Sequence, residues 1–151
     1  MRIVTIDHDQ ESFRFRIPTK KDWEDLAEYL MPLLKPGSIV TLSGPLGAGK
    51  TTFVQVLAKR LGVKKNPSSP TFALMRAYAL PGHRTIKRLL HVDAYRIESE
   101  RELMVLDLDE ELADGKTIAV IEWPEKIEQW LMKKKVFQVK IALEVDENEE
   151  E

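Results

Sequence analysis

The sequence predicts an α/β fold in a single domain, and three observations support this prediction. A glycine-rich motif at residues 41–52 stands between a short apolar run and a segment of helical periodicity, which is typical of a strand, a loop and a helix in succession. Residues 117–121 form an uninterrupted apolar run, as expected of a central parallel strand buried on both faces. The 151 residues, of which 43% are hydrophobic, suit one domain with a substantial core.

The composition narrows the classes of function. The chain contains no cysteine, which excludes disulfides, thiolate catalysis and zinc sites built on cysteine. No apolar run approaches ~18 residues and the N-terminus lacks a signal-like layout, so we expect a cytoplasmic protein with no membrane contact. The net charge is −2, and five of the acidic residues lie in 146–151. We expect a folded domain over residues 1–145 and a disordered acidic tail over residues 146–151.

The N-terminal part is expected to form two strands and a helix. Residues 2–5 and 12–17 favour β structure and flank a polar segment, which indicates a hairpin or two short edge strands. Thr19 is expected to cap the helix that follows, with Asp22 in the third position of a capping box. Pro36 begins the segment that ends this helix. The apolar face of the helix consists of Trp23, Leu26, Ala27, Leu30, Leu33 and Leu34.

The motif at the centre of the chain is TLSGPLGAGKTT, which contains the phosphate-binding pattern G-x-x-x-x-G-K-[ST]. Residues 38–42 form the apolar strand before it, and Lys50–Leu61 form the helix after it, with Gly62 at the C-terminal end. Glycines allow loop N–H groups to crowd around a phosphate, and the helix N-terminus adds partial positive charge. The alternative interpretation is a glycine turn that leads into an ordinary helix and binds no phosphate.

This pattern assigns roles to its residues. Lys50 is expected to reach the β- and γ-phosphates of ATP, and the Thr51 hydroxyl to ligate Mg²⁺. The predicted nucleotide-binding residues are Gly44, Leu46, Gly47, Ala48, Gly49, Lys50, Thr51 and Thr52.

A stiff segment rich in serine and proline follows the helix and ends in Thr71. Many P-loop proteins place a hydroxyl here to sense the γ-phosphate and Mg²⁺, but a plain helix-to-strand connection explains the segment equally well. Residues 72–80 and 88–93 flank a turn signal and predict a long hairpin. Its basic residues form either a solvated face or a docking surface for RNA or a partner protein; they are Arg76, Arg84, Lys87 and Arg88.

Two acids stand at predicted strand ends, where α/β sheets bind ligands. Asp93 closes one apolar strand as a Walker B carboxylate does, and Glu122 follows the buried run at 117–121. Each acid alone has a second interpretation, as a strand-end cap or an ion-pair partner. Trp123 belongs either to the core or to the wall of the phosphate pocket. Both acids are candidate metal ligands and catalytic residues.

The remaining elements are predicted from periodicity. Residues 98–106 and 108–113 read as short acidic helices, and 125–132 as a helix that begins after Pro124. Alternating apolar and polar residues then predict a half-buried strand, with Phe137, Val139, Ile141, Leu143 and Val145 on its buried face.

Taken together, these residues make the chain resemble the TsaE (YjeE) family, the small ATPases of bacterial tRNA threonylcarbamoyladenosine synthesis. The resemblance covers roughly residues 19–130. It implies a single-domain P-loop NTPase fold with a mixed, mainly parallel central sheet flanked by helices. It also implies that the chain binds ATP, ADP and Mg²⁺. Four blocks carry it: LSGPLGAGKTTF (Leu42–Phe53), SPTF (Ser69–Phe72), HVDAYR (His91–Arg96) and IEWPEK (Ile121–Lys126).

The resemblance also implies partners and site residues. The partners are TsaB and TsaD, with tRNA contacted indirectly, and TsaD transfers threonylcarbamoyl to adenosine in tRNAs that read ANN codons. ATP hydrolysis would reset this complex between turnovers. By position, Thr71 is the switch-like hydroxyl, Asp93 and Glu122 are the acids at the metal and attacking water, and Trp123 lines the nucleotide site. Two departures from the family pattern are Pro45 in the loop and Asp107 in place of a glycine.

Three functions remain open from the sequence. The first is an ATP hydrolase that regulates a tRNA-modifying complex, and the second is a small-molecule kinase with the same loop. Against the kinase, the chain shows no lid of clustered arginines and no second-substrate domain. The third is a nucleotide-gated adaptor that does not hydrolyse ATP. The sequence shows no evident arginine finger in cis, although it leaves Arg96 as a candidate for that role. We therefore expect slow hydrolysis by the protein alone.

Overall fold

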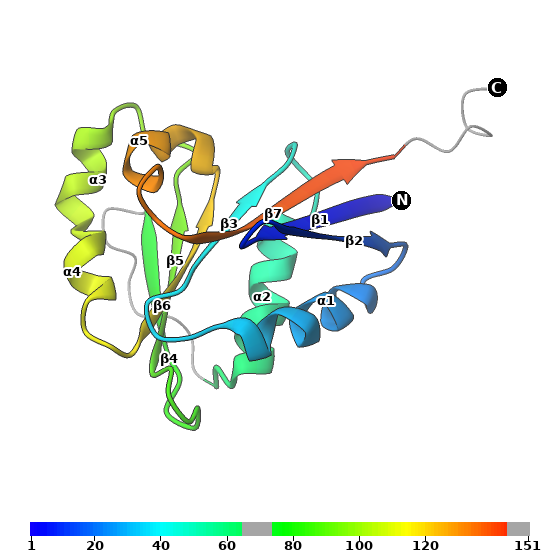
Figure 1. Cartoon of the computed structure of the whole chain (residues 1–151), viewed down its shortest axis with the longest axis horizontal. Coiled ribbons are helices and arrows are strands. Elements are labelled where there is room, and N and C mark those ends of the chain that lie inside the picture. Colours follow the sequence, from blue (N-terminus) through cyan, green and yellow to red (C-terminus); the bar gives the residue numbers. More distant parts are fainter. Residues whose placement is uncertain (65–73, 145–151) are drawn as a thin grey trace.

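The computed structural model describes residues 1–64 and 74–144. Their core is a seven-stranded sheet in the order β2-β1-β7-β3-β6-β5-β4 (Figure 1). The strands are β1 (Arg2–His8), β2 (Glu11–Ile17), β3 (Ile39–Ser43), β4 (Met75–Ala79), β5 (Arg88–Asp93), β6 (Thr117–Glu122) and β7 (Val136–Leu143). The helices are α1 (Asp22–Leu30), η1 (Met31–Leu33), α2 (Lys50–Leu61), α3 (Glu100–Leu106), α4 (Leu108–Leu112), η2 (Pro124–Ile127) and α5 (Glu128–Leu131).

The centre of the sheet is parallel and its edges are antiparallel. Strand β3 runs parallel to both β6 and β7, and β5 runs parallel to β6. At the edges, β1 is antiparallel to both β2 and β7, and β4 is antiparallel to β5. All six residues of β6 are buried, because helices cover both faces of the central strands. This arrangement confirms the predicted α/β fold with a mixed, mainly parallel sheet.

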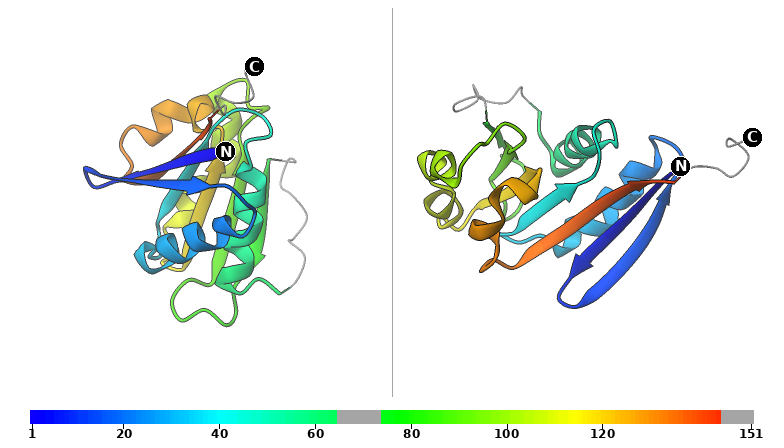
Figure 2. Two further views of the ribbon diagram at one scale, coloured as in Figure 1. Left: turned by 90° about the vertical axis from the view of Figure 1, so that its right-hand side faces the viewer. Right: turned by 90° about the horizontal axis from the view of Figure 1, so that it is seen from above.

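Helices lie on both faces of the sheet, as the two views in Figure 2 show. Helices α1 and α2 pack on one face, where Leu26, Phe53 and Leu57 are fully buried together with Val120 of β6. Helices α3 and α4 pack with η2 and α5 on the other face, where their apolar residues meet Ile121. No helix within residues 1–64 and 74–144 is long and apolar enough to cross a membrane.

The start of α1 matches the predicted cap in part. The backbone N–H and the hydroxyl of Thr19 both donate to Asp22 Oδ2, at 2.9 and 2.6 Å. The bond from the Thr19 N–H to Asp22 is the capping-box contact predicted for Asp22. The Thr19 hydroxyl caps no N–H group of the first turn, and α1 begins at Asp22, directly after Lys21. The apolar face is buried as predicted except for Leu33, which is 39% exposed.

The predicted helix over residues 125–132 is divided in two. A single 3₁₀ segment, η2, precedes the one-turn helix α5. Ile127 separates them with φ −134° and ψ 36°, outside the helical region, so the hydrogen-bond ladder does not continue. The last strand shows the predicted alternation, but Leu143 is 51% exposed, and Val145 lies outside the described residues together with the predicted tail.

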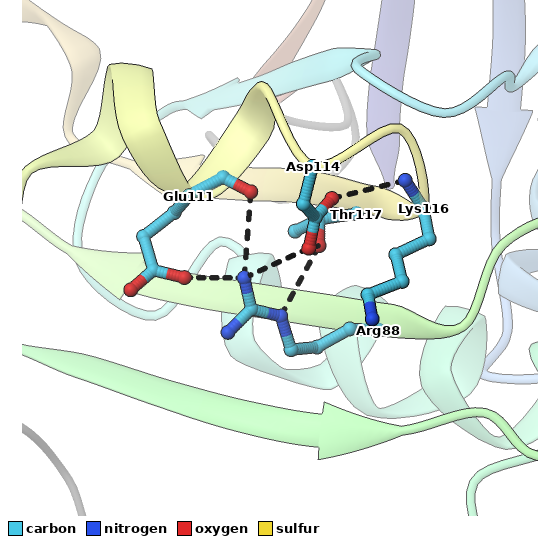
Figure 3. A network of polar contacts seen from close by, with 5 residues as sticks. All are labelled: Arg88, Glu111, Asp114, Lys116 and Thr117. Atoms are coloured by element: carbon cyan, nitrogen blue, oxygen red, sulfur yellow. Dashed lines mark hydrogen bonds and ion pairs between the residues drawn. The ribbon is translucent and has the colours of Figure 1, made fainter.

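Arg88 does not belong to an exposed basic face, which corrects that part of the hairpin prediction. Its Nε donates to Thr117 Oγ1 at 3.1 Å, and a terminal nitrogen pairs with the carboxylates of Glu111 and Asp114 (Figure 3). Asp114 also accepts from the Thr117 hydroxyl at 2.7 Å and from the Lys116 N–H at 2.9 Å. This network ties α4 and the turn after it to strands β5 and β6.

Candidate functional site

The glycine-rich loop joins β3 to α2, and two of its glycines are required by close packing. Gly44 has φ +153°, and a Cβ there would lie 2.8 Å from the Ile141 carbonyl oxygen of β7. Gly49 has φ +110°, and a Cβ there would lie 2.6 Å from Cζ2 of Trp23. Side chains are therefore excluded at both ends of the loop, and α2 begins at Lys50 immediately after it.

Lys50 is held inside this loop. Its side chain is only 5% exposed, and its ammonium donates to the Gly44 carbonyl and approaches the Pro45 carbonyl at 3.5 Å. The ammonium also lies 3.4 Å from the ring centroid of Trp123. Burial lowers the pKa of Lys50, while the charges of Glu122 and other nearby carboxylates act to raise it. The charged end of Lys50 is therefore held between the loop carbonyls and the Trp123 ring.

Parallel pairing brings the two predicted acids together. Asp93 lies opposite Glu122 in the register of β5 and β6, at the edge of the sheet where the loop begins. Glu122 is 3% exposed, and its Oε1 accepts a hydrogen bond from the Thr51 hydroxyl at 3.1 Å. Asp93 is exposed and accepts from the backbone N–H of Tyr95 at 3.1 Å. The two carboxylates therefore differ, one being buried beside the loop and the other closing the turn after its strand.

His91 was not among the predicted site residues. Its Nε2 lies 2.6 Å from Glu122 Oε2, so the Glu122 carboxylate is held between His91 and Thr51. The sequence carried a signal for it, since His91 and Asp93 are two residues apart on one strand and so face the same side of the sheet.

Trp123 lies at the edge of the site rather than wholly in the core. Its backbone has φ +61°, an uncommon conformation for a bulky residue, and its indole packs on Tyr95 with ring centroids 4.9 Å apart. Its indole also meets the Lys50 ammonium, so this backbone conformation directs the ring toward the loop. The pocket-wall interpretation of Trp123 therefore agrees with its position.

These elements enclose a cleft of about 320 Å³. A larger hollow of about 750 Å³ runs along α1 and α2, but Thr52 is the one predicted site residue that it contains. Of the other predicted residues, Ala48 is fully buried and Gly44 packs against Ile141 at the start of the loop, while Thr71 falls outside the described residues. The cleft is lined by Arg2, Leu46, Gly47, Gly49, Lys50, Thr51, Thr52, Asp93, Tyr95, Glu122 and Trp123.

The donor set of the cleft suits one kind of metal ion. Among the residues that the structure describes, no group of three or more histidine or carboxylate side chains is arranged to hold a metal. The Thr51 hydroxyl and the Glu122 carboxylate instead offer hard oxygen atoms 3.1 Å apart, with Asp93 on the neighbouring strand. Mg²⁺ binds through one or two protein oxygens, water and substrate phosphates. The residues therefore fit Mg²⁺ held jointly with a nucleotide.

Comparisons with known proteins agree with this geometry. The family model described as "Threonylcarbamoyl adenosine biosynthesis protein TsaE" matches residues 17–151. A Bacillus subtilis protein named "tRNA threonylcarbamoyladenosine biosynthesis protein TsaE" is 34% identical over 121 residues, covering 80% of this chain and 72% of its own. A Streptomyces coelicolor protein of the same name is 43% identical over 107 residues, covering 70% of each chain. The crystal structure of Bacillus subtilis YdiB superposes with a TM-score of 0.65 at 25% identity, over 97% of this chain and 81% of that one.

Proposed function

The chain belongs to the TsaE family, and from this premise we propose that it binds and hydrolyses ATP in the biosynthesis of tRNA threonylcarbamoyladenosine. One observation carries the proposal. The Thr51 hydroxyl at the start of α2 lies 3.1 Å from the buried carboxylate of Glu122 at the end of β6, in the cleft that contains the Lys50 ammonium. A cation, a hydroxyl and a carboxylate that converge on a glycine-rich loop are the groups that a P-loop hydrolase needs.

Each residue has a part in this proposal. The loop N–H groups and the α2 N-terminus bind the phosphates, and Lys50 exchanges its contact with the Gly44 carbonyl for the β- and γ-phosphates. Thr51 and Glu122 would hold Mg²⁺, with Asp93 acting on the metal or its water. The bound ion would neutralise the charge of the phosphates.

The chemical step is transfer of the γ-phosphoryl group to water. The water oxygen forms a bond to phosphorus and gives a proton to the released phosphate, the bond to the β–γ bridging oxygen breaks, and ADP leaves. A carboxylate beside the cleft orients the water by accepting its hydrogen bond. His91 holds the Glu122 carboxylate in position for this role, since His91 Nε2 lies 2.6 Å from Glu122 Oε2. Trp123 lines one wall of the site.

The finer role depends on partners. We propose that the state of the nucleotide alters the fit of this protein to TsaB and TsaD, and that hydrolysis resets that pair between turnovers. Thr71 would respond to the γ-phosphate; it lies outside the described residues, so its role rests on the sequence and the family resemblance. Such a switch requires the partner to bind the ATP and ADP states with different affinities.

The test is calorimetric titration with ATP and ADP, with and without Mg²⁺, followed by measurement of phosphate release. We expect binding of both nucleotides and Mg²⁺-dependent release of phosphate. Tight binding without release in the presence of partners would favour the nucleotide-gated adaptor. Formation of ADP without release of free phosphate, with the phosphoryl group transferred to a small molecule, would favour the kinase. Absence of nucleotide binding would refute the proposal.

A further inference from the structure

The N-terminal hairpin brings an arginine to the phosphate-binding loop. Strand β1 is antiparallel to β7, with Arg2 opposite Leu143, and β7 is parallel to β3. The first residue of β1 therefore lies at the sheet edge where β3 ends and the loop begins. Figure 1 shows β1 beside β7, next to the strand that leads into the loop. The family model matches this chain from residue 17 onward, so Arg2 lies outside the matched residues.

The guanidinium of Arg2 contacts the loop directly. Its Nε donates to the Ala48 carbonyl at 2.6 Å, in a partly buried position. The same nitrogen would lie 3.5 Å from a Cβ at Gly49, and Arg2 lines the cleft together with Lys50. This bond uses one of five N–H groups and fixes the guanidinium beside the loop.

The charge of Arg2 has no carboxylate partner in the described part of the chain. Two other arginines there form ion pairs, Arg60 with Glu28 and Arg88 with Glu111. For Arg2 the bond to Ala48 is the one side-chain hydrogen bond within residues 1–64 and 74–144. The terminal nitrogens of this fixed cation therefore remain for a ligand, and a planar guanidinium suits phosphate oxygens.

We propose that Arg2 is a second cationic contact to the phosphates of the nucleotide, supplied within the same chain by the N-terminal hairpin. This inference rests on the proposed nucleotide binding. Arg2 binds the Ala48 carbonyl, next to Gly49, in the part of the loop whose backbone cradles the α- and β-phosphates, whereas the lysine extends to the β- and γ-phosphates. Arg2 therefore contributes equally to ATP and ADP affinity.

The test compares Arg2→Gln with wild type and with Arg16→Gln, a matched loss of charge at an exposed position on the neighbouring strand β2. Calorimetric titrations use ATP and ADP at low and high salt. We expect Arg2→Gln to weaken both nucleotides by about 10-fold or more at low salt, as for loss of a charge-assisted hydrogen bond. The deficit becomes smaller at high salt, Arg2→Lys recovers part of the affinity, and Arg16→Gln binds like wild type.

Two results would overturn the inference and leave the proposed function standing. In the first, Arg2→Gln binds both nucleotides like wild type while Lys50→Ala does not. In the second, Arg2→Gln loses the same affinity at all salt concentrations and its unfolding midpoint without nucleotide falls, which would make Arg2 only a support for the Ala48 carbonyl. If wild type binds neither nucleotide, the proposed function itself fails.

Discussion

Replacing Glu122 with glutamine changes the charge in the site and almost nothing else. The two side chains have nearly the same volume, and Glu122 is 3% exposed, so no cavity forms. The amide oxygen still accepts from the Thr51 hydroxyl, which lies 3.1 Å from Oε1. The amide NH₂ then faces His91 Nε2, 2.6 Å from Oε2, and the histidine must accept instead of donate.

This geometry separates the effects on stability and on activity. The hydrogen bonds to Thr51 and His91 can both be kept. We therefore expect Glu122→Gln to lower the unfolding free energy by about 3 kcal/mol at most, the upper end of the range for a weakened buried hydrogen bond. The lost negative charge acts on the metal, and changes at or near metal ligands cost roughly 10–100-fold in metal affinity or activity. Mg²⁺-dependent hydrolysis should therefore decline far more than Mg²⁺-free nucleotide binding.

The assay is phosphate release over a range of Mg²⁺ concentrations, with calorimetric ATP binding in the absence of Mg²⁺. Glu128→Gln is the matched control, since Glu128 is an exposed carboxylate on α5. Full Mg²⁺-dependent turnover by Glu122→Gln would refute the reasoning and leave Glu122 as a buried partner of Thr51 and His91.

Four further predictions follow from the same structure. Lys50→Ala should fold and lose ~10- to 150-fold in ATP affinity by calorimetry, the equivalent of one charge-assisted contact; unchanged affinity would remove Lys50 from the site. Asp93→Asn should reduce Mg²⁺-dependent phosphate release more than Mg²⁺-free binding, and intact turnover would leave Asp93 a strand-end cap. Gly49→Ala should lower the unfolding free energy by roughly 1–3 kcal/mol in a denaturant titration, since φ is +110° and the new Cβ meets Trp23; an unchanged midpoint would contradict this. For Asp114, burial tends to raise the pKa, but hydrogen bonds from Lys116 and Thr117 and the charge of Arg88 hold the pKa below its usual value. The ionised Asp114 should therefore stabilise the fold above pH ~4, and this contribution should disappear as the pH falls further. The difference in unfolding free energy between wild type and Asp114→Asn should follow the same pH dependence.

Local signals predicted several elements of this fold closely. Helix α2 begins at Lys50 and ends before Gly62 as expected, because the loop glycine and the left-handed Gly62 mark both ends within the sequence itself. Strand β6 was predicted from its β-branched and apolar run, because a central strand buried on both faces consists mostly of such residues. The register of β5 and β6 then placed Asp93 and Glu122 at one edge, as predicted from their positions at strand ends.

Other features depend on contacts that distant segments make. The Arg2 bond to Ala48 joins residues 46 positions apart, and it exists only because β7 lies between β1 and β3 in the sheet. His91 acquires its place from Glu122 on another strand. The hydrophobic periodicity predicted one helix over residues 125–132, because periodicity carries no information on the non-helical backbone conformation of Ile127. Strand order and local backbone conformation are therefore the parts that sequence patterns left out.

The most direct test of the central claim is phosphate release from ATP, measured for the protein alone and then with the TsaB–TsaD pair and tRNA. The described cleft contains Lys50 and Arg2 but no further cation, and Arg96 is exposed and does not line it. We therefore predict slow Mg²⁺-dependent hydrolysis alone and a clear acceleration on assembly, since an arginine supplied in trans raises such rates by ~10³–10⁵. Equal rates in both conditions, with equal partner binding in ATP, ADP and nucleotide-free states, would contradict the account.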